Sequence, residues 1–110
     1  MGIRLERFNR LIQEEISELI REELPSDQYG WVSVTMVKTS PDLSEAHVFI
    51  TVFPEHLEGK ILQKLNQMAG YIRKHLSRRV RAKTVPRLRF EIDNYTKLVE
   101  RGVINPSEGD

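Results

Sequence analysis

Residues 31–53 carry the clearest structural signal in the chain and read WVSVTMVKTSPDLSEAHVFITVF. Val32, Val34 and Met36 alternate with polar residues, and the second half of the stretch alternates in the same way. A period of two is typical of strands that bury one face. The stretch therefore predicts a β-hairpin with strands at 31–39 and 46–53. The apolar positions of the second strand are Ala46, Val48, Ile50 and Val52.

Helical patterns flank this hairpin on both sides. Residues 4–24 place apolar side chains three or four positions apart, which predicts a helix with one buried stripe. A second stripe runs through roughly residues 55–82, but Gly70 interrupts it. Glycine in a helix interior costs about 1 kcal/mol relative to alanine. We therefore expect a helix kink, or a close approach to the backbone, at Met68, Ala69 and Gly70.

The order of these elements predicts an α+β fold. Residues 87–92 alternate apolar and charged side chains and form a third expected strand. One domain over residues 1–94 would hold a three-stranded sheet with its helices on one face. The long helical connection makes the second and third strands parallel. Residues 95–110 carry a weaker pattern and are expected to form a partly ordered C-terminal tail.

Charge is unevenly distributed along the 110 residues. The formal net charge is +1, yet residues 73–89 hold eight cationic side chains and no acid, against 9 Lys and Arg with 16 Asp and Glu elsewhere. Such a block favours a surface for phosphates, because like charges repel unless a polyanion neutralises them. The alternative is a solvated face balanced by acids from elsewhere in the fold. The candidate RNA-binding residues are Arg73, Lys74, Arg78, Arg79, Arg81, Lys83, Arg87 and Arg89.

Helical spacing predicts that the cations of this block point in different directions around the helix. Lys74, Arg78 and Arg81 lie opposite the apolar stripe, whereas Arg79 lies at the edge of the stripe. We expect the outward cations to form a single ridge, and about five phosphate contacts would give a slope near −4 for log affinity against log salt. The first turns of the N-terminal helix, with three further arginines, are candidates to face the same partner. These are Arg4, Arg7 and Arg10.

Three stretches together resemble the ribosome-binding factor A family and its type II KH-like fold. Residues 40–50 read SPDLSEAHVFI, residues 70–73 read GYIR, and residues 85–90 read VPRLRF with Asp93 soon after. The resemblance extends over about residues 4–94. It implies a non-enzymatic assembly factor that binds the free small ribosomal subunit late in maturation and supports processing of its rRNA. An assembly GTPase is a further partner that the resemblance suggests.

The residues offer no arrangement typical of catalysis or metal binding. The chain has no Cys, and His47, His56 and His75 are scattered, so surface or structural roles are favoured for them. No two glycines have the Gly-x-x-Gly spacing with which KH modules hold four nucleotides, so we expect contacts to RNA shape and phosphates. We expect a soluble, cytoplasmic monomer with no enzymatic activity, cofactor, metal or membrane attachment.

The sequence leaves two alternatives open. Trp31, Phe49 and Phe53 are able to stack on bases if they lie on an open sheet face, although such aromatics more often cover a sheet edge or pack against a terminal segment. The competing functional hypothesis is a protein-interaction module whose basic face docks on an acidic partner protein.

Overall fold

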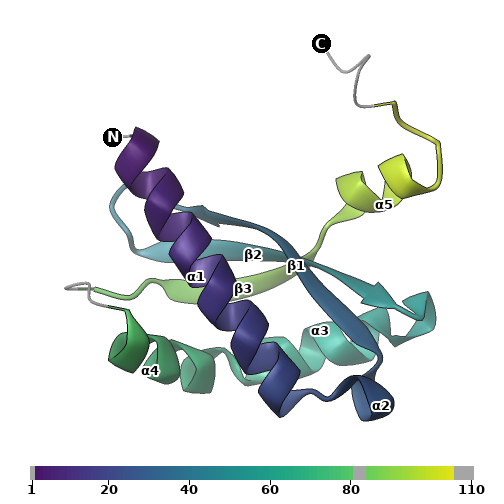
Figure 1. The fold of residues 1–110 in the computed structure, drawn as a ribbon, viewed down its shortest axis with the longest axis horizontal. Coiled ribbons are helices and arrows are strands. Elements are labelled where there is room, and N and C mark those ends of the chain that lie inside the picture. Colours follow the sequence, from purple (N-terminus) through teal and green to yellow (C-terminus); the bar gives the residue numbers. More distant parts are fainter. Residues whose placement is uncertain (1, 81–83, 106–110) are drawn as a thin grey trace.

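The structure is a computed structural model that describes residues 2–80 and 84–105. Figure 1 shows a sheet flanked by helices, in the predicted order helix, strand, strand, broken helix, strand. The α+β fold is confirmed. The elements are α1 (Gly2–Glu23), α2 (Ser26–Tyr29), β1 (Trp31–Thr39), β2 (Glu45–Phe53), the 3-10 turn η1 (Glu55–Leu57), α3 (Glu58–Gln67), α4 (Ala69–Arg79), β3 (Arg87–Ile92) and α5 (Asn94–Glu100).

The sheet has the predicted topology. Its order is β1-β2-β3, with β1 antiparallel and β3 parallel to β2. Ala46 pairs with Leu88 and Val48 with Phe90, and all four side chains are buried beneath α1, α3 and α4. The opposite side of the sheet, which we call the open face, carries the alternate residues of each strand. On β1 and β2 these include Trp31, Ser33, Met36, Phe49, Thr51 and Phe53.

A β-bulge in β1 overturns one expectation from the sequence. The register with β2 shifts between Val34 and Met36, because one extra residue of β1 is accommodated there. The bulge reverses the alternation, so Met36 is 37% exposed on the open face while Val37 is buried. The Gln13 side chain of α1 donates a hydrogen bond to the Val34 carbonyl, at 3.0 Å, beside this bulge.

Helix α1 packs along the sheet through the stripe that its sequence predicts. Ile12, Ile16 and Leu19 are fully buried in the core, together with Ile20 and Leu24. On the flank, the Thr39 hydroxyl donates to Asn9 Oδ1 at 2.5 Å, so the helix is also tied to β1 by a polar contact. Within the described ranges no helix is both long and apolar enough to cross a membrane.

The predicted long helix over 55–82 is two helices that meet at Met68. The stripe continues across the break, since Ile61 and Leu65 of α3 and Ile72 and Leu76 of α4 are buried. The side chain of Asn66 accepts from the Phe90 N–H at 3.0 Å and donates to the Phe90 carbonyl at 3.2 Å. This amide pairs with the outer edge of β3 as a further strand would, so it holds the α3–α4 junction against the sheet.

Helix α5 follows β3 directly, and all of it except Asn94 belongs to the stretch expected to form the tail. The Asp93 carboxylate caps this helix, accepting from the Thr96 N–H at 2.9 Å and the Thr96 hydroxyl at 2.7 Å. It also accepts from the Thr35 hydroxyl at 2.5 Å, which anchors α5 to β1. Asp93 is only 7% exposed. Burial opposes its ionisation, but the hydrogen bonds from Thr35 and Thr96 outweigh burial and lower the pKa of Asp93.

Replacing Asp93 with alanine is expected to lower the free energy of unfolding at pH 7 by about 1–2 kcal/mol, because the cap of α5 and the partner of Thr35 are lost. Since the pKa of Asp93 is lowered by folding, its contribution is complete above the ordinary aspartate pKa of about 3.9 and fades as the pH falls below it. Urea unfolding at pH 7 and pH 3 measures both effects. An equal cost at the two pH values would contradict the role of the ionised carboxylate.

Candidate nucleic-acid interface

Helix α4 turns one side to the core and carries cations on the other. Ile72 and Leu76 are buried, while Arg73, Lys74 and Arg78 are exposed. This separation arises because apolar residues recur every four positions and the cations occupy the positions between them. Three of the eight predicted RNA-binding residues are therefore exposed on α4.

A shallow groove of about 360 Å³ lies between α4 and the segment that leads into β3. The Arg73 Nε donates to the Val85 carbonyl at 2.9 Å, which ties the helix to that segment. The residues along this groove, which we call the α4 groove, include two cations and no carboxylate. They are Gly70, Arg73, Lys74, Ser77, Thr84 and Val85.

Gly70 leaves the wall of the α4 groove open at the first turn of the helix. A Cβ atom built at this position would meet no heavy atom within 4 Å. The glycine is therefore not required by packing, and what it provides is space beside the helix backbone. A phosphate could approach the N-terminal turn of α4 closely there, next to Arg73 and Lys74.

Gly70→Ala is expected to raise the free energy of unfolding by up to about 1 kcal/mol, because alanine favours the helix and the added methyl group meets no neighbour. The same change is expected to weaken RNA binding, because the methyl group enters the α4 groove. Gly59→Ala in α3 is the matched control, since a Cβ atom there also meets nothing within 4 Å. The control is expected to gain stability without any loss of binding. Unchanged binding by the Gly70→Ala variant would rule out close approach at this turn.

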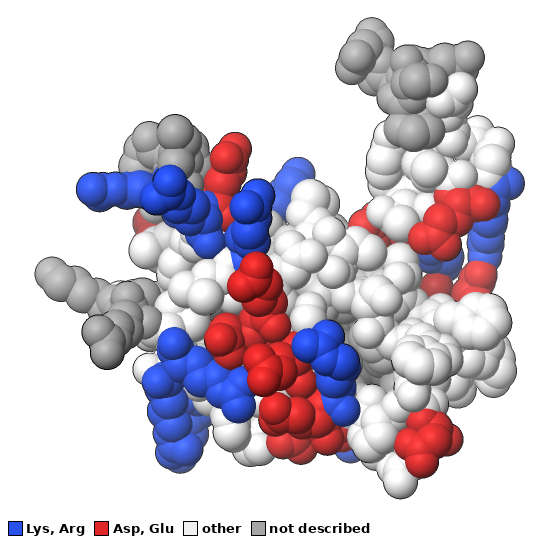
Figure 2. Space-filling view, in the orientation of Figure 1, with Lys and Arg blue, Asp and Glu red and all other residues white. Residues whose placement is uncertain are grey.

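Arg79 is not part of this surface. Its guanidinium lies 3.3 Å from Glu15 Oε2 and 3.9 Å from Glu22 Oε2, both on α1. The hydrogen bond to Glu15 raises the pKa of Arg79. Figure 2 shows the reason, since carboxylates gather over the C-terminal half of α1 beside the cations of α4. Arg79 is therefore paired with carboxylates of α1, unlike the other exposed cations of α4, and its role in RNA binding stays a prediction.

The two cations of β3 also lie apart from α4. Leu88 and Phe90 point into the core, so Arg87 and Arg89 project from the open face, on the other side of the sheet. They pair in register with Glu45 and with His47, respectively. The expected single ridge is thus divided between two faces of the molecule. Arg81 and Lys83 lie outside the described residues.

His47 belongs to a network of charged side chains on this open face. Its Nε2 is 2.9 Å from Glu45 Oε1, and its Nδ1 contacts Glu91 Oε2. A neutral imidazole has only one N–H donor, so both contacts are hydrogen bonds only when the ring is protonated. These carboxylates reduce the positive potential around Arg87 and Arg89. Phosphates are therefore expected to bind more favourably at the α4 groove than at the cations of β3.

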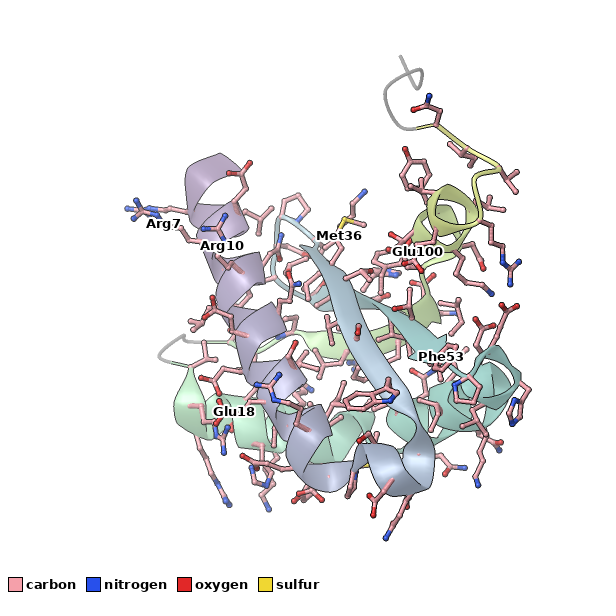
Figure 3. All side chains as sticks on the ribbon, turned by 45° about the vertical axis from the view of Figure 1, so that its right-hand side comes forward. Arg7, Arg10, Glu18, Met36, Phe53 and Glu100 are labelled. Carbon is pink, nitrogen blue, oxygen red and sulfur yellow. The ribbon has the colours of Figure 1, made fainter. Side chains whose placement is uncertain are left out.

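A second basic surface lies at the start of α1. Arg4, Arg7 and Arg10 are exposed and follow one another at intervals of three, which places them on neighbouring parts of one helical side. Figure 3 shows Arg7 and Arg10 projecting from the first turns of α1. The N-terminal end of α1 and the C-terminal end of α4 lie at the same side of the molecule in Figures 1 and 3. Both basic surfaces therefore lie towards the left-hand side of Figure 1, that of α1 above and that of α4 below, although 63 positions separate Arg10 from Arg73 in the sequence.

Comparisons with known proteins find one family. The family model described as ribosome-binding factor A matches residues 4–102. The ribosome-binding factor A of Acinetobacter baumannii (strain AYE) is 41% identical over 101 residues, which are 84% of this chain and 76% of the relative. That of Pseudomonas putida (strain GB-1) is 39% identical over 103 residues, which are 91% of this chain and 76% of the relative.

Solved structures of the same name share the fold. The crystal structure of ribosome-binding factor A from Thermus thermophilus has a TM-score of 0.71 at 27% identity, over 80% of this chain and 93% of that one. A homology model of the Thermus thermophilus factor, fitted into the cryo-EM map of its 30S complex, has a TM-score of 0.66 at 28% identity. That match covers 76% of this chain and 88% of the other.

Proposed function

Because this chain belongs to the ribosome-binding factor A family, we propose that it binds the free small ribosomal subunit through rRNA phosphates and supports late maturation of that subunit, including processing of its rRNA. The observation that carries the proposal is the α4 groove, where Arg73 and Lys74 stand beside the open backbone at Gly70. A groove with cations and no acid attracts a polyanion, and the missing side chain at Gly70 admits its backbone.

The family relationship supports the small subunit as the partner. The Thermus thermophilus relative has been fitted into a 30S complex, and it shares the fold of this chain. The exposed cations on α4 and at the start of α1 supply a phosphate-binding surface of the kind that this partner requires. An assembly GTPase as a second partner, the monomeric state, the cytoplasmic location and the absence of enzymatic activity stay predictions.

Sedimentation with purified ribosomal particles tests the proposal. The chain is incubated separately with small subunits, large subunits and joined ribosomes, and each mixture is centrifuged through a sucrose cushion. We expect selective co-sedimentation with the free small subunit. Equal recovery with all three particles would indicate non-specific attraction of cations to rRNA and would contradict the proposed selectivity.

The salt dependence of binding is expected to reveal how many phosphates are contacted. Contacts from Arg73, Lys74 and Arg78 alone would give a slope of about −2 to −3 for log affinity against log monovalent salt, at fixed magnesium. Participation of Arg4, Arg7 and Arg10 would steepen it to about −4 to −5. A slope near zero would exclude phosphate contacts altogether.

Nuclease treatment separates this proposal from docking on an acidic protein. The chain is used to capture partners from a lysate, with and without prior digestion of RNA. Partners held through rRNA are lost after digestion, whereas a directly bound acidic protein is retained. Retention of a partner that depends on Lys74 and Arg78 would favour the protein-interaction hypothesis.

A further inference from the structure

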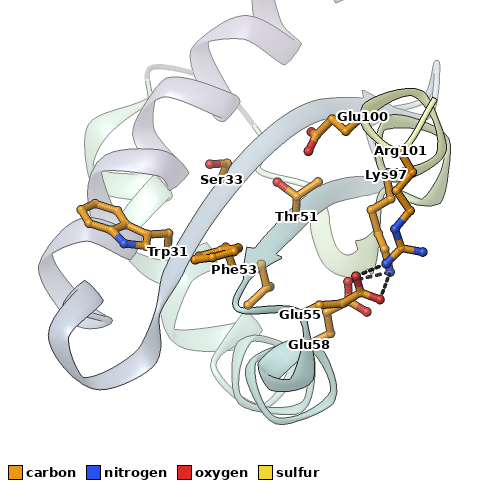
Figure 4. Close-up of a pocket in the computed structure, with 10 residues that line it drawn as sticks. Trp31, Ser33, Thr51, Phe53, Glu55, Glu58, Lys97, Glu100 and Arg101 are labelled. Atoms are coloured by element: carbon orange, nitrogen blue, oxygen red, sulfur yellow. Dashed lines mark hydrogen bonds and ion pairs between the residues drawn. The ribbon is translucent and has the colours of Figure 1, made fainter.

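The open face of the sheet holds a second concave site, far from the α4 groove. A cavity of about 320 Å³ lies between the sheet and α5, with Ser33 and Thr51 on its floor. Figure 4 shows Trp31 and Phe53 on one side of this cavity and Glu100 of α5 on the other. Trp31 is 66% exposed and Phe53 is 71% exposed, although they occupy paired positions on neighbouring strands. Large exposed aromatic side chains beside a cavity are typical of interaction sites.

The charges around this cavity leave one carboxylate unneutralised. Lys97 Nζ lies 2.7 Å from Glu58 Oε2 and 3.5 Å from Glu55 Oε1, and Arg101 also contacts Glu55. Two cations are thus matched by two acids. Among the residues that the structure describes, no cation lies within ion-pair distance of Glu100, and Figure 4 shows its carboxylate directed over the sheet towards Thr51. The site therefore carries a net charge of about −1 at neutral pH.

We propose that this cavity binds an arginine side chain from a basic segment of a partner protein. The guanidinium would stack on the Phe53 ring, with Trp31 beside it, pair with the Glu100 carboxylate and donate to the hydroxyls of Ser33 and Thr51. Arginine fits because its flat, delocalised cation stacks on aromatic rings while its N–H groups remain free to donate in the plane. The charge of the site excludes a phosphate, which Glu100 would repel.

This site goes beyond the proposed RNA contact and is independent of it. The α4 groove lies on the helix-covered side of the sheet, and the Glu100 cavity lies on the open face. The two sites also attract opposite charges. One molecule is therefore able to hold rRNA with α4 and a basic protein segment with its open face at the same time.

The single tryptophan of the chain gives a direct test, because Trp31 lines the cavity. Titration with the peptide acetyl-Gly-Arg-Gly-amide is expected to change Trp31 fluorescence saturably. The matching lysine peptide is expected to bind about threefold more weakly, because ammonium does not stack in the same way. Glu100→Gln and Phe53→Ala are each expected to raise the dissociation constant about fivefold.

Two controls keep the result interpretable. Glu18→Gln removes a carboxylate from the exposed surface of α1, which lies on the other side of the sheet, and is expected to leave arginine binding unchanged. A single-stranded oligouridine is titrated in parallel. Absence of any saturable response to the arginine peptide would overturn the proposal. So would tighter binding of oligouridine that is insensitive to Glu100→Gln, since that result would identify the aromatic face as a platform for bases.

Discussion

A variant carrying Lys74→Glu and Arg78→Glu is expected to bind the small ribosomal subunit about 100-fold more weakly than the unaltered chain while keeping its fold. Each lost charge-assisted contact to a phosphate is worth about 1.5–3 kcal/mol, which is at least tenfold in affinity. Both side chains are exposed and stand four positions apart on α4. The double substitution replaces a pair of neighbouring positive charges with a pair of neighbouring negative charges, so the repulsion within the helix stays about the same. The cost in stability is expected to stay below about 1 kcal/mol, because Arg78→Glu places a carboxylate near the negative, C-terminal end of the helix dipole.

The matched control reverses two cations on helices other than α4. Arg21→Glu with Lys60→Glu changes the net charge by the same amount, and both side chains are exposed on other helices. If binding depended only on overall charge, the two double variants would lose affinity equally. We expect the control to lose less than about fivefold. Thermal unfolding of both variants shows whether the fold is retained, and a melted Lys74→Glu, Arg78→Glu variant would contradict the observed helical phase.

Gly30→Ala is expected to cause a large loss of stability, about 3 kcal/mol or more in the free energy of unfolding. Gly30 has φ of 77° and ψ of −174°, a backbone conformation that is essentially restricted to glycine. A Cβ atom there would lie 2.6 Å from the carbonyl oxygen of Phe53. That oxygen belongs to β2, next to the pairing of Trp31 with Phe53, so it cannot withdraw without disturbing the hairpin.

Urea unfolding at pH 7 measures this loss, and Gly59→Ala serves as the reference. Gly59 has no neighbour within 4 Å of an added Cβ atom, so its replacement in α3 is expected to be neutral or stabilising. The two substitutions are expected to change the free energy of unfolding in opposite directions, because the two glycines differ in backbone conformation and in what an added Cβ atom would contact. A Gly30→Ala variant within about 0.5 kcal/mol of the unaltered chain would show that the turn before β1 adapts to a side chain.

Local periodicity was sufficient to predict most of the fold. The period of two in β2 placed Ala46, Val48 and Ile50 on the buried side, and the structure confirms all three. The same alternation predicted that Met36 is buried, and this prediction was wrong. A β-bulge depends on how two strands pair, and the alternation within one strand carries no information about that pairing. The start of α5 is marked in the sequence by Asp93, a residue type that favours the N-cap position and accepts here from the Thr96 N–H three positions on.

The candidate site shows where sequence periodicity stops being informative. The exposure of Lys74 and Arg78 followed from helical spacing, because residues of one helix keep fixed angles to one another. The pairing of Arg79 with Glu15 joins residues 64 positions apart, and the cavity beside Glu100 joins β1, β2 and α5. Contacts of this kind depend on how the elements pack, and Coulomb interactions change steeply with the resulting distances. The pattern of residues thus sets which side chains face solvent, whereas packing sets which of those side chains remain unneutralised and able to bind.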